Sequence, residues 1–286
     1  MIVHHLNCGT LCPLSARLVT GTGSYFERGR MVCHCLLIET NAGLVLVDTG
    51  IGRDDVAMAH PFGRFFEVLA KPALDPDETA WQQIRGLGFR AEDVRHAVVT
   101  HLDIDHAGGL RDFPEALVHV HARELGAARA RSGPADRLRY APRQWQNGVT
   151  FQAYDEEGEP WHGFQAVRPL RGLPEDILLV PLTGHSRGHS GVAVRSEKGW
   201  LLHCGDSYFF HGQLDPLAPW CPPGLRLMQW LDQSSGVDRR RNVSRLRQLV
   251  AERGDLVRLF SSHDATELER CRLAAPRQRE PVPVSL

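Results

Sequence analysis

Residues 98–109 read VVTHLDIDHAGG, so that an apolar run passes directly into four potential metal ligands, His101, Asp103, Asp105 and His106. In an extended segment alternate residues face the same side, and the first three of these ligands can therefore point together. His106 follows where the chain turns, and the two glycines after it allow the backbone to bend close to the cluster. Imidazole and carboxylate ligands together suit zinc, iron or manganese. This stretch predicts a metal site at the end of a buried strand.

Three further candidates occupy the same kind of position, each a few residues beyond an apolar segment that is expected to form a strand. They are His185 after residues 178–182, Asp206 after 200–204 and His263 after 256–260. Ligands gather at strand ends in the sheets of α/β proteins. With the first stretch this makes seven side chains, a number that suits two metal ions sharing a bridging carboxylate and a bridging hydroxide.

Strands and helices interleave along the sequence, which favours an α/β or α+β class and a single domain over residues 1–286. Strands are expected at residues 33–38, 43–48, 97–100, 118–121, 177–182, 191–195, 200–204 and 256–260, and helices at 77–87, 122–131 and 239–253. Asp77 is expected to cap the first of these helices. Residues 132–177 have no clear period and are expected to be irregular, and residues 274–286 are expected to be a loose tail.

The composition argues against several classes of protein. Among 286 residues, 33 Lys and Arg stand against 34 Asp and Glu, and a net charge of −1 gives no electrostatic reason to bind nucleic acid or an anionic membrane. No apolar run is long enough to cross a bilayer. The first residues lack the cationic start and apolar stretch of a signal peptide, so we expect a cytoplasmic location. The count that stands out is 15 His.

These motifs resemble those of the metallo-β-lactamase superfamily, which carries H-x-H-x-D-H followed by later His, Asp and His ligands. Residues 46–50, Leu-Val-Asp-Thr-Gly, resemble its early signature. Within the superfamily the sequence is most similar to the N-acyl-homoserine lactone lactonases. The matching stretches are residues 35–50, 86–129, 179–210 and 243–272, in which LTGHSRGH at 182–189 resembles T-P-G-H-S-P-G-H and Ser-His-Asp at 262–264 resembles G-H-D.

The resemblance implies an α+β fold, the four-layer αβ/βα sandwich, with two divalent metal ions at one edge between the sheets. By this resemblance, His101, Asp103 and His185 would hold one ion, Asp105, His106 and His263 the other, and Asp206 would bridge them. Asp48 would orient ligands through hydrogen bonds rather than bind metal. The implied reaction is the opening of a lactone or the cleavage of another neutral ester by a metal-bridging hydroxide. Asp105 would hand a proton to the leaving alkoxide.

Asp103 departs from the family motif, which has histidine at this position. In the usual site, two divalent ions against two carboxylates and a hydroxide leave one positive charge, and Asp103 cancels it. A neutral site is a weaker Lewis acid, and an added oxygen ligand tilts the preference from zinc toward iron or manganese. We expect Asp103 to be a ligand nonetheless. Zinc remains the first expectation for both ions.

A second departure concerns a tyrosine that the lactonases place three residues after the bridging Asp, where this chain has Phe209. Tyr208 lies one residue earlier and is the candidate for contact with substrate. Pocket walls are expected from residues 53–76, 132–177 and 208–230. Their aromatic side chains would make the pocket apolar: Phe62, Phe65, Phe66, Trp145, Phe164, Phe209 and Trp220. The expected partner is a small-molecule substrate, with a homodimer left open.

Other readings of the same residues remain. A phosphotriesterase or a thioesterase of the same superfamily would share these motifs, and an iron-dependent oxidoreductase could use the same ligands. Residues 184–188, Gly-His-Ser-Arg-Gly, also match the G-x-S-x-G nucleophile elbow, and Ser186, Asp206 and His263 follow the order of a hydrolase triad. An elbow requires a helix directly after the serine, and here glycines and a β-rich segment follow. A triad would also leave the first four ligands unexplained.

Overall fold

The computed structural model describes residues 1–58, 60 and 63–274, and within them the strands form two mixed six-stranded sheets. The first sheet has the order β1 (Ile2–Leu11), β2 (Met31–Thr40), β3 (Gly43–Val47), β4 (Val94–Val98), β5 (Leu117–His121) and β6 (Thr150–Tyr154). The second has the order β12 (Val257–Phe260), β11 (Gly199–His203), β10 (Ser190–Ser196), β9 (Ile177–Pro181), β8 (Phe164–Pro169) and β7 (Glu159–Trp161). Each sheet joins antiparallel and parallel pairs.

Helices lie between and beside these strands. In chain order they are α1 (Ala16–Thr20), α2 (Arg53–Ala57), α3 (Arg64–Ala70), α4 (Ala80–Gly86), α5 (Ile104–Ala107), α6 (Ala122–Ala130), α7 (Pro134–Arg139), α8 (Pro223–Leu231), α9 (Gly236–Arg253) and α10 (Ala265–Ala274). None of the helices in the described part of the chain is long and apolar enough to cross a membrane.

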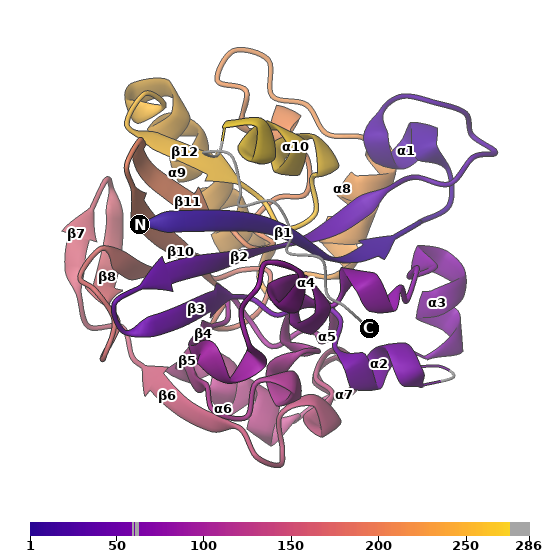
Figure 1. Cartoon of the computed structure of the whole chain (residues 1–286). Coiled ribbons are helices and arrows are strands. Elements are labelled where there is room, and N and C mark those ends of the chain that lie inside the picture. Colours follow the sequence, from indigo (N-terminus) through magenta and orange to yellow (C-terminus); the bar gives the residue numbers. More distant parts are fainter. Residues whose placement is uncertain (59, 61–62, 275–286) are drawn as a thin grey trace.

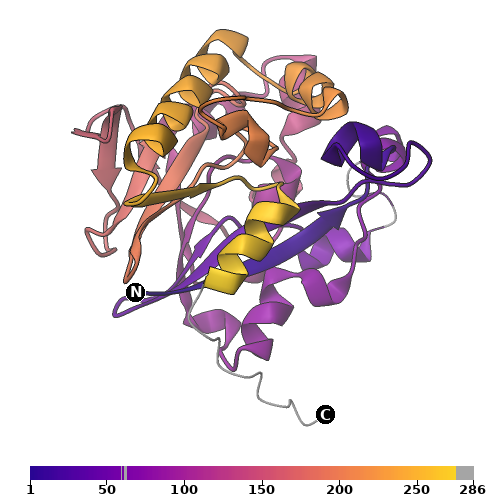
Figure 2. The same cartoon turned by 90° about the horizontal axis from the view of Figure 1, so that it is seen from above.

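Alternation along the strands builds the layers. In β2 and β3, Ile38 and Val47 face a core shared with Leu179 and Val194 of the second sheet. The residues that alternate with these along β2 and β3 face the opposite side of the sheet and pack under α4 and α6. On the other side, α9 covers the outer face of the second sheet. Figures 1 and 2 show the resulting helix–sheet–sheet–helix arrangement. The four-layer αβ/βα sandwich implied by the family resemblance is therefore confirmed.

The strand ends explain where the polar cluster lies. Strands β3 and β4 run parallel to each other in the first sheet, and strands β11 and β12 run parallel to each other in the second. Strand β9 runs parallel to β11, since both are antiparallel to β10. Within each sheet the carboxyl ends of these strands therefore lie at the same edge. The candidate ligands follow those ends.

Several local predictions from the sequence were wrong. The helix predicted at 77–87 begins later, because Thr79 rather than Asp77 caps α4 by accepting the N–H of Gln82. Residues 132–177 are not irregular, since they contain α7 and three strands, β6 to β8. Strand β1 was not predicted at all. Most of the tail predicted at 274–286 lies outside the described residues.

Candidate metal centre

The seven predicted ligands come together from both halves of the chain. His101 and Asp103 follow β4, and Asp105 and His106 lie in α5, which begins directly after Asp103. His185, Asp206 and His263 follow β9, β11 and β12 in the second sheet. All seven are buried except Asp105, whose side chain is 17% exposed.

Two compact groups share one carboxylate. His101, His185 and Asp206 form one group and His106, Asp206 and His263 form the other, and in each group the donor atoms all lie within 4.8 Å of one another. Asp206 Oδ1 lies 3.4 Å from His106 Nε2, and Asp206 Oδ2 lies 3.1 Å from His263 Nε2 and 3.5 Å from His185 Nε2. Asp206 thus has the placement expected of a carboxylate between two cations.

The remaining two aspartates flank these groups. Asp103 Oδ2 lies 3.1 Å from His185 Nε2 and 3.4 Å from His101 Nε2. Asp105 Oδ2 lies 3.6 Å from His263 Nε2. Each aspartate therefore lies beside the group to which the family resemblance assigns it.

Neighbouring groups direct the imidazoles toward the centre of the cluster. Asp48 accepts a hydrogen bond from His106 Nδ1 at 2.9 Å, and Val32 O accepts one from His263 Nδ1 at 2.8 Å. Thr100 Oγ1 donates to Asp48 and can accept from His101 Nδ1 at 2.9 Å. With Nδ1 protonated in each ring, Nε2 keeps its lone pair for a metal ion. Asp48 therefore lies where an orienting residue is expected.

The buried polar atoms of the cluster fit a metal centre. His101 Nε2, His106 Nε2 and Asp206 Oδ1 are buried and have no hydrogen-bond partner among the described residues. An unpaired buried polar atom costs free energy, which makes three of them pointing at one another unfavourable without a further binding partner. Divalent cations satisfy all three at once.

The electrostatics of the cluster favour positive charge. Burial by itself lowers the pKa of His263, but Asp206 and Asp105 outweigh it and raise that pKa to about 9. The pKa of His106 is likewise raised well above its ordinary value, because Asp206, Asp105 and Asp48 outweigh burial. Burial raises the pKa of Asp206, yet His263 and His106 hold it well below its usual range. Carboxylates that attract protons to imidazoles will also attract metal cations.

Two further buried side chains hold the ligand loops in place. His189 Nδ1 donates to Leu182 O at 2.9 Å, and its Nε2 accepts the backbone N–H of Asp206 at 2.8 Å. The Glu124 carboxylate, at the start of α6, accepts the backbone N–H groups of Leu102 and Gly188. These contacts connect the loops that carry His101, His185 and Asp206.

Sequence reasoning missed Arg139, the last residue of α7. Its Nη1 donates to Asp103 Oδ2 at 2.8 Å and lies 3.1 Å from His185 Nε2. Its Nη2 donates to Asp232 Oδ1 at 2.6 Å. The signal in the sequence was the extra carboxylate Asp103, which calls for a cation, but the sequence does not say which of its many arginines supplies it. Cys33 was also missed, and it forms a compact group with Asp105 and His263.

The geometry argues against the serine triad. Ser186 Oγ donates to Glu124 Oε2 at 2.6 Å, whereas His263 faces Asp206 and Val32. The residues after Ser186 lead into strand β10 rather than into a helix. A nucleophile elbow requires that helix, so the G-x-S-x-G match is not one.

Tyr208 and several predicted pocket residues lie elsewhere. Tyr208 is fully buried, and its hydroxyl donates to Glu267. Trp145 packs in the core beneath the first sheet and Phe164 in the core under α9, so neither lines a pocket at the ligands. Phe62 and the side chains of Phe65 and Phe66 lie outside the described residues.

An apolar cluster does border the ligands. The Phe209 ring lies 5.0 Å from that of His263 and 6.2 Å from that of His185, centroid to centroid. Phe209 packs with Met31, Ile51 and Leu225, and Ile104 packs against the same cluster. Ile104 separates Asp103 from Asp105 in the chain, so apolar side chains adjoin the candidate centre.

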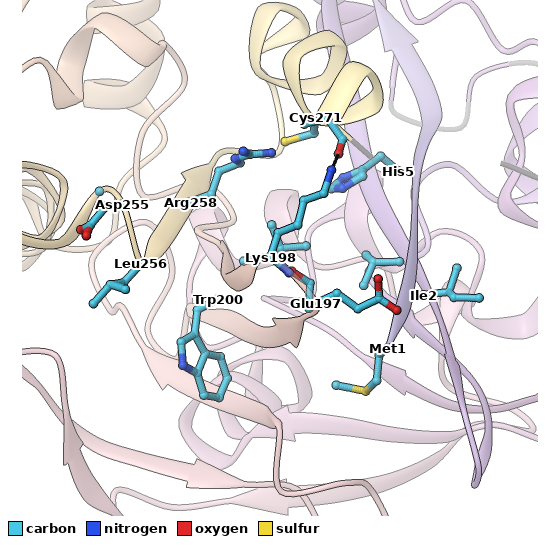
Figure 3. Close-up of a pocket in the computed structure, with 15 residues that line it drawn as sticks. Met1, Ile2, His5, Glu197, Lys198, Trp200, Asp255, Leu256, Arg258 and Cys271 are labelled. Carbon is cyan, nitrogen blue, oxygen red and sulfur yellow. Dashed lines mark hydrogen bonds between the residues drawn. The ribbon is translucent and has the colours of Figure 1, made fainter. Parts of the chain in front are cut away.

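A separate cavity lies away from the ligands. Figure 3 shows it between the start of β1, the β10–β11 hairpin, β12 and α10. Lys198 crosses it and donates to Ala274 O at 2.8 Å. None of the seven predicted ligands lines this cavity.

Comparison with known proteins identifies relatives that are described as metal-dependent hydrolases or lactonases. The sequence pattern of the metallo-beta-lactamase superfamily matches residues 28–262. A probable metallo-hydrolase of Mycobacterium tuberculosis is 45% identical over 213 residues, which cover 74% of this chain and 64% of that protein. An N-acyl homoserine lactonase of Bacillus cereus is 24% identical over 264 residues, which cover 92% of this chain and 93% of the lactonase.

The fold also matches a solved structure. An N-acyl homoserine lactone hydrolase with N-hexanoyl-L-homoserine bound at its catalytic metal centre superposes with a TM-score of 0.70 at 20% identity. The match covers 95% of this chain and 98% of the hydrolase. At this identity the likeness concerns the fold alone.

Proposed function

This chain belongs to the metallo-β-lactamase superfamily, and from that membership and its buried ligands we propose that it is a dinuclear metal hydrolase acting on lactones or other neutral esters. The observation that carries the proposal is that Asp206 belongs to both groups of three donors. A carboxylate shared in this way is what a two-metal site would require of the protein.

The seven residues divide between two ions as follows: His101, Asp103 and His185 would hold one, Asp105, His106 and His263 the other, and Asp206 both. When bound, two divalent ions supply Lewis acidity toward a carbonyl oxygen and an activated water as nucleophile. We take zinc as the first candidate. Iron or manganese is the alternative, because Asp103 adds an oxygen donor.

Asp105 is the residue best placed to move a proton. It is the most exposed of the seven, with 17% of its side chain accessible, and its Oδ2 lies 3.6 Å from His263 Nε2. A carboxylate there can take a proton from the attacking water and deliver it to the leaving alkoxide oxygen. Tyr208 has no part in this proposal, since its hydroxyl is bound to Glu267.

The apolar cluster around Phe209 favours a substrate with an apolar substituent. Phe209 and Ile104 lie beside the ligands, so an acyl or alkyl chain bound there would place its carbonyl at the centre. The lactonases among the similar proteins act on acylated lactones, as their names state, which supports the same substrate class.

The test is a substrate panel. Protein stripped with a chelator and reloaded with Zn, Mn or Fe is assayed on acylated lactones, aryl esters, thioesters and phosphotriesters. We expect hydrolysis of lactones or carboxylic esters by the loaded protein only. No ester or lactone turnover with any metal would overturn the proposal. A preference for the phosphotriester, or oxygen consumption by the iron form, would replace it with one of the alternatives.

Two variants sharpen this test. Asp206→Ala removes the shared carboxylate, and we expect a loss of at least about 100-fold in kcat/KM. Ser186→Ala removes the hydroxyl that binds Glu124 and should leave kcat/KM within about tenfold of the wild type, whereas a catalytic serine would cost far more.

A further inference from the structure

Asp103 receives a strong ionic partner from outside the ligand cluster. An isolated β-bridge pairs the backbone of Asp103 with that of Tyr140, the residue after α7. This pairing brings Arg139 beside Asp103, and Arg139 Nη1 donates to Asp103 Oδ2 at 2.8 Å. The two side chains are only 13% and 12% exposed, so solvent screens the contact weakly.

The Asp103 oxygen that binds Arg139 is also the one that faces the histidines. Oδ2 lies 3.1 Å from His185 Nε2 and 3.4 Å from His101 Nε2. A carboxylate oxygen has two lone pairs and can accept a guanidinium N–H while it binds a cation, whereas the single lone pair of His185 Nε2, which Nη1 also approaches at 3.1 Å, would pass to the bound ion. Arg139 therefore fixes the orientation of Asp103 toward the first group of ligands.

Asp232 holds the other end of the guanidinium. Arg139 Nη2 donates to Asp232 Oδ1 at 2.6 Å and to Asp232 O at 2.8 Å. Asp232 directly follows α8, and its Oδ2 lies 4.0 Å from His185 Nε2, but its side chain is 52% exposed and water screens its charge more than that of Asp103. Two partners for one guanidinium restrict its rotation and hold Nη1 on Asp103.

Asp103 and Arg139 change the formal charge of the proposed two-metal site in opposite directions. Two divalent ions, three carboxylates and a hydroxide sum to zero, which is one positive charge fewer than a site with histidine in place of Asp103. The permanent positive charge of Arg139 restores that difference. It also draws electron density from Oδ2, which makes the carboxylate a weaker, more histidine-like donor.

We infer that Arg139 is a positioning residue that lets Asp103 serve in place of a histidine, by orienting its carboxylate and neutralising its charge at the first metal. The inference rests on the proposed two-metal site. It makes Asp103 and Arg139 a matched pair, so that each residue is unfavourable without the other.

A double-mutant cycle tests this pairing through metal binding rather than turnover. The variants are Arg139→Gln, Asp103→His and the double variant, each measured for Zn equivalents and affinity by chelator competition and for the visible spectrum of the Co(II) form. Arg187→Gln is the matched control, because Arg187 contacts Asp136 of α7 and none of the ligands. Circular dichroism of each protein establishes that it is folded.

We expect each single variant to bind the weaker ion about 10–100-fold less tightly than the wild type, with an altered Co(II) spectrum. The double variant, with an ordinary histidine and no stray guanidinium, should bind at least about tenfold more tightly than either single variant. Arg187→Gln should match the wild type.

Two results would overturn the pairing. One is an Arg139→Gln protein with wild-type affinity and spectrum, and the other is a double variant whose loss equals the sum of the two single losses. A wild-type protein that binds fewer than two ions would instead overturn the two-metal proposal itself. The two failures are therefore distinguishable.

Discussion

Asp48 shows how one residue outside the ligand set controls its geometry. Its carboxylate accepts the Thr100 backbone N–H at 2.7 Å, the Thr100 hydroxyl at 2.8 Å and His106 Nδ1 at 2.9 Å. Burial raises its pKa, but His106 outweighs this and lowers the pKa, so Asp48 is ionised. Its φ of 54° lies in the left-handed region, which Asp and Asn adopt more readily than most residues.

Asp48→Asn therefore tests whether Asp48 orients His106. Asn adopts the same backbone conformation but carries no negative charge. We expect metal affinity to fall about 10–100-fold, since Asn has one acceptor oxygen, whereas Asp48 uses one oxygen for the Thr100 N–H and the other for the Thr100 hydroxyl and His106 Nδ1. Competition with a chromophoric chelator measures this. An Asp48→Asn protein with unchanged affinity would contradict the assigned role.

Glu267 is a buried carboxyl outside the candidate metal centre. Burial and the nearby Asp264 raise its pKa from 4.5 to about 8. Between these values the folded chain keeps a proton that the unfolded chain releases. The free energy of unfolding therefore falls as pH rises through this window, by at most about 1.4 kcal/mol per pH unit.

Glu267→Gln should remove this decline, because an amide does not titrate. We expect the difference in Tm between pH 5 and pH 8 to be smaller in the variant than in the wild type, both measured with excess metal. Glu269→Gln, on the exposed side of the same helix, should retain the wild-type difference. If Glu267→Gln shows the wild-type difference as well, the raised pKa is wrong.

At the scale of elements, the start of α6 joins two ligand loops. Glu124 accepts the N–H of Leu102 at 3.1 Å, the hydroxyl of Ser186 at 2.6 Å and the N–H of Gly188 at 2.9 Å. Gly188 has to be glycine here, because a Cβ would collide with the backbone of Glu124. One carboxylate thus fixes the segments that carry His101 and His185.

Glu124→Ala should leave three buried donors without an acceptor. We expect a loss of roughly 3 kcal/mol in the free energy of unfolding, measured by urea denaturation, together with weaker metal binding. Glu156→Ala is the comparison, since Glu156 makes an exposed ion pair with Arg123 and should cost under about 1 kcal/mol. Equal losses in the two variants would show that Glu124 has no special role.

The elements that the sequence predicted are those with a simple apolar pattern. Strand β3 and the last two residues of β4 are buried and apolar, and Asp48 and His101 follow them within three residues, so strand and candidate ligand could be predicted together. Strand β1 is buried too, but it carries His4, His5 and Asn7, and these polar residues hide the pattern. Their partners, such as Glu39 and His34, are distant in the sequence.

The candidate site could also be predicted only in part, because local patterns do not show contacts between distant residues. The candidate ligands that follow strand ends could be picked out from the sequence. Arg139 and Glu124 could not, because they contact residues 36 and 62 positions away. Tyr208 was chosen by its distance from Asp206 in sequence, but Cys204 and Tyr208 both belong to the core under α9. Tertiary packing decided these positions.

At the scale of the whole molecule, the cluster joins the two halves of the chain. His101 to His106 come from the first sheet and His185, Asp206 and His263 from the second, so bound metal would connect the two sheets. Without metal, the buried carboxylates of Asp103 and Asp206 and the partly exposed Asp105 beside them repel one another. Metal binding should therefore stabilise the folded state more than a surface ion would.

We expect this as a shift in Tm. A ligand at 100 times its Kd stabilises the folded state by about 2.7 kcal/mol, which for a chain of this size corresponds to roughly 5–10 °C. Differential scanning calorimetry of chelator-treated and Zn-reloaded protein measures the shift. Identical unfolding temperatures would show that the cluster holds no metal of consequence.

The most direct test of the central claim is a titration of activity against metal. Stripped protein receives Zn in increments, and the rate of lactone or ester hydrolysis is measured at each addition. The account predicts no activity in the stripped protein and a rate that reaches its maximum at two equivalents per chain. Activity that persists after stripping, or that is complete at one equivalent, would contradict it.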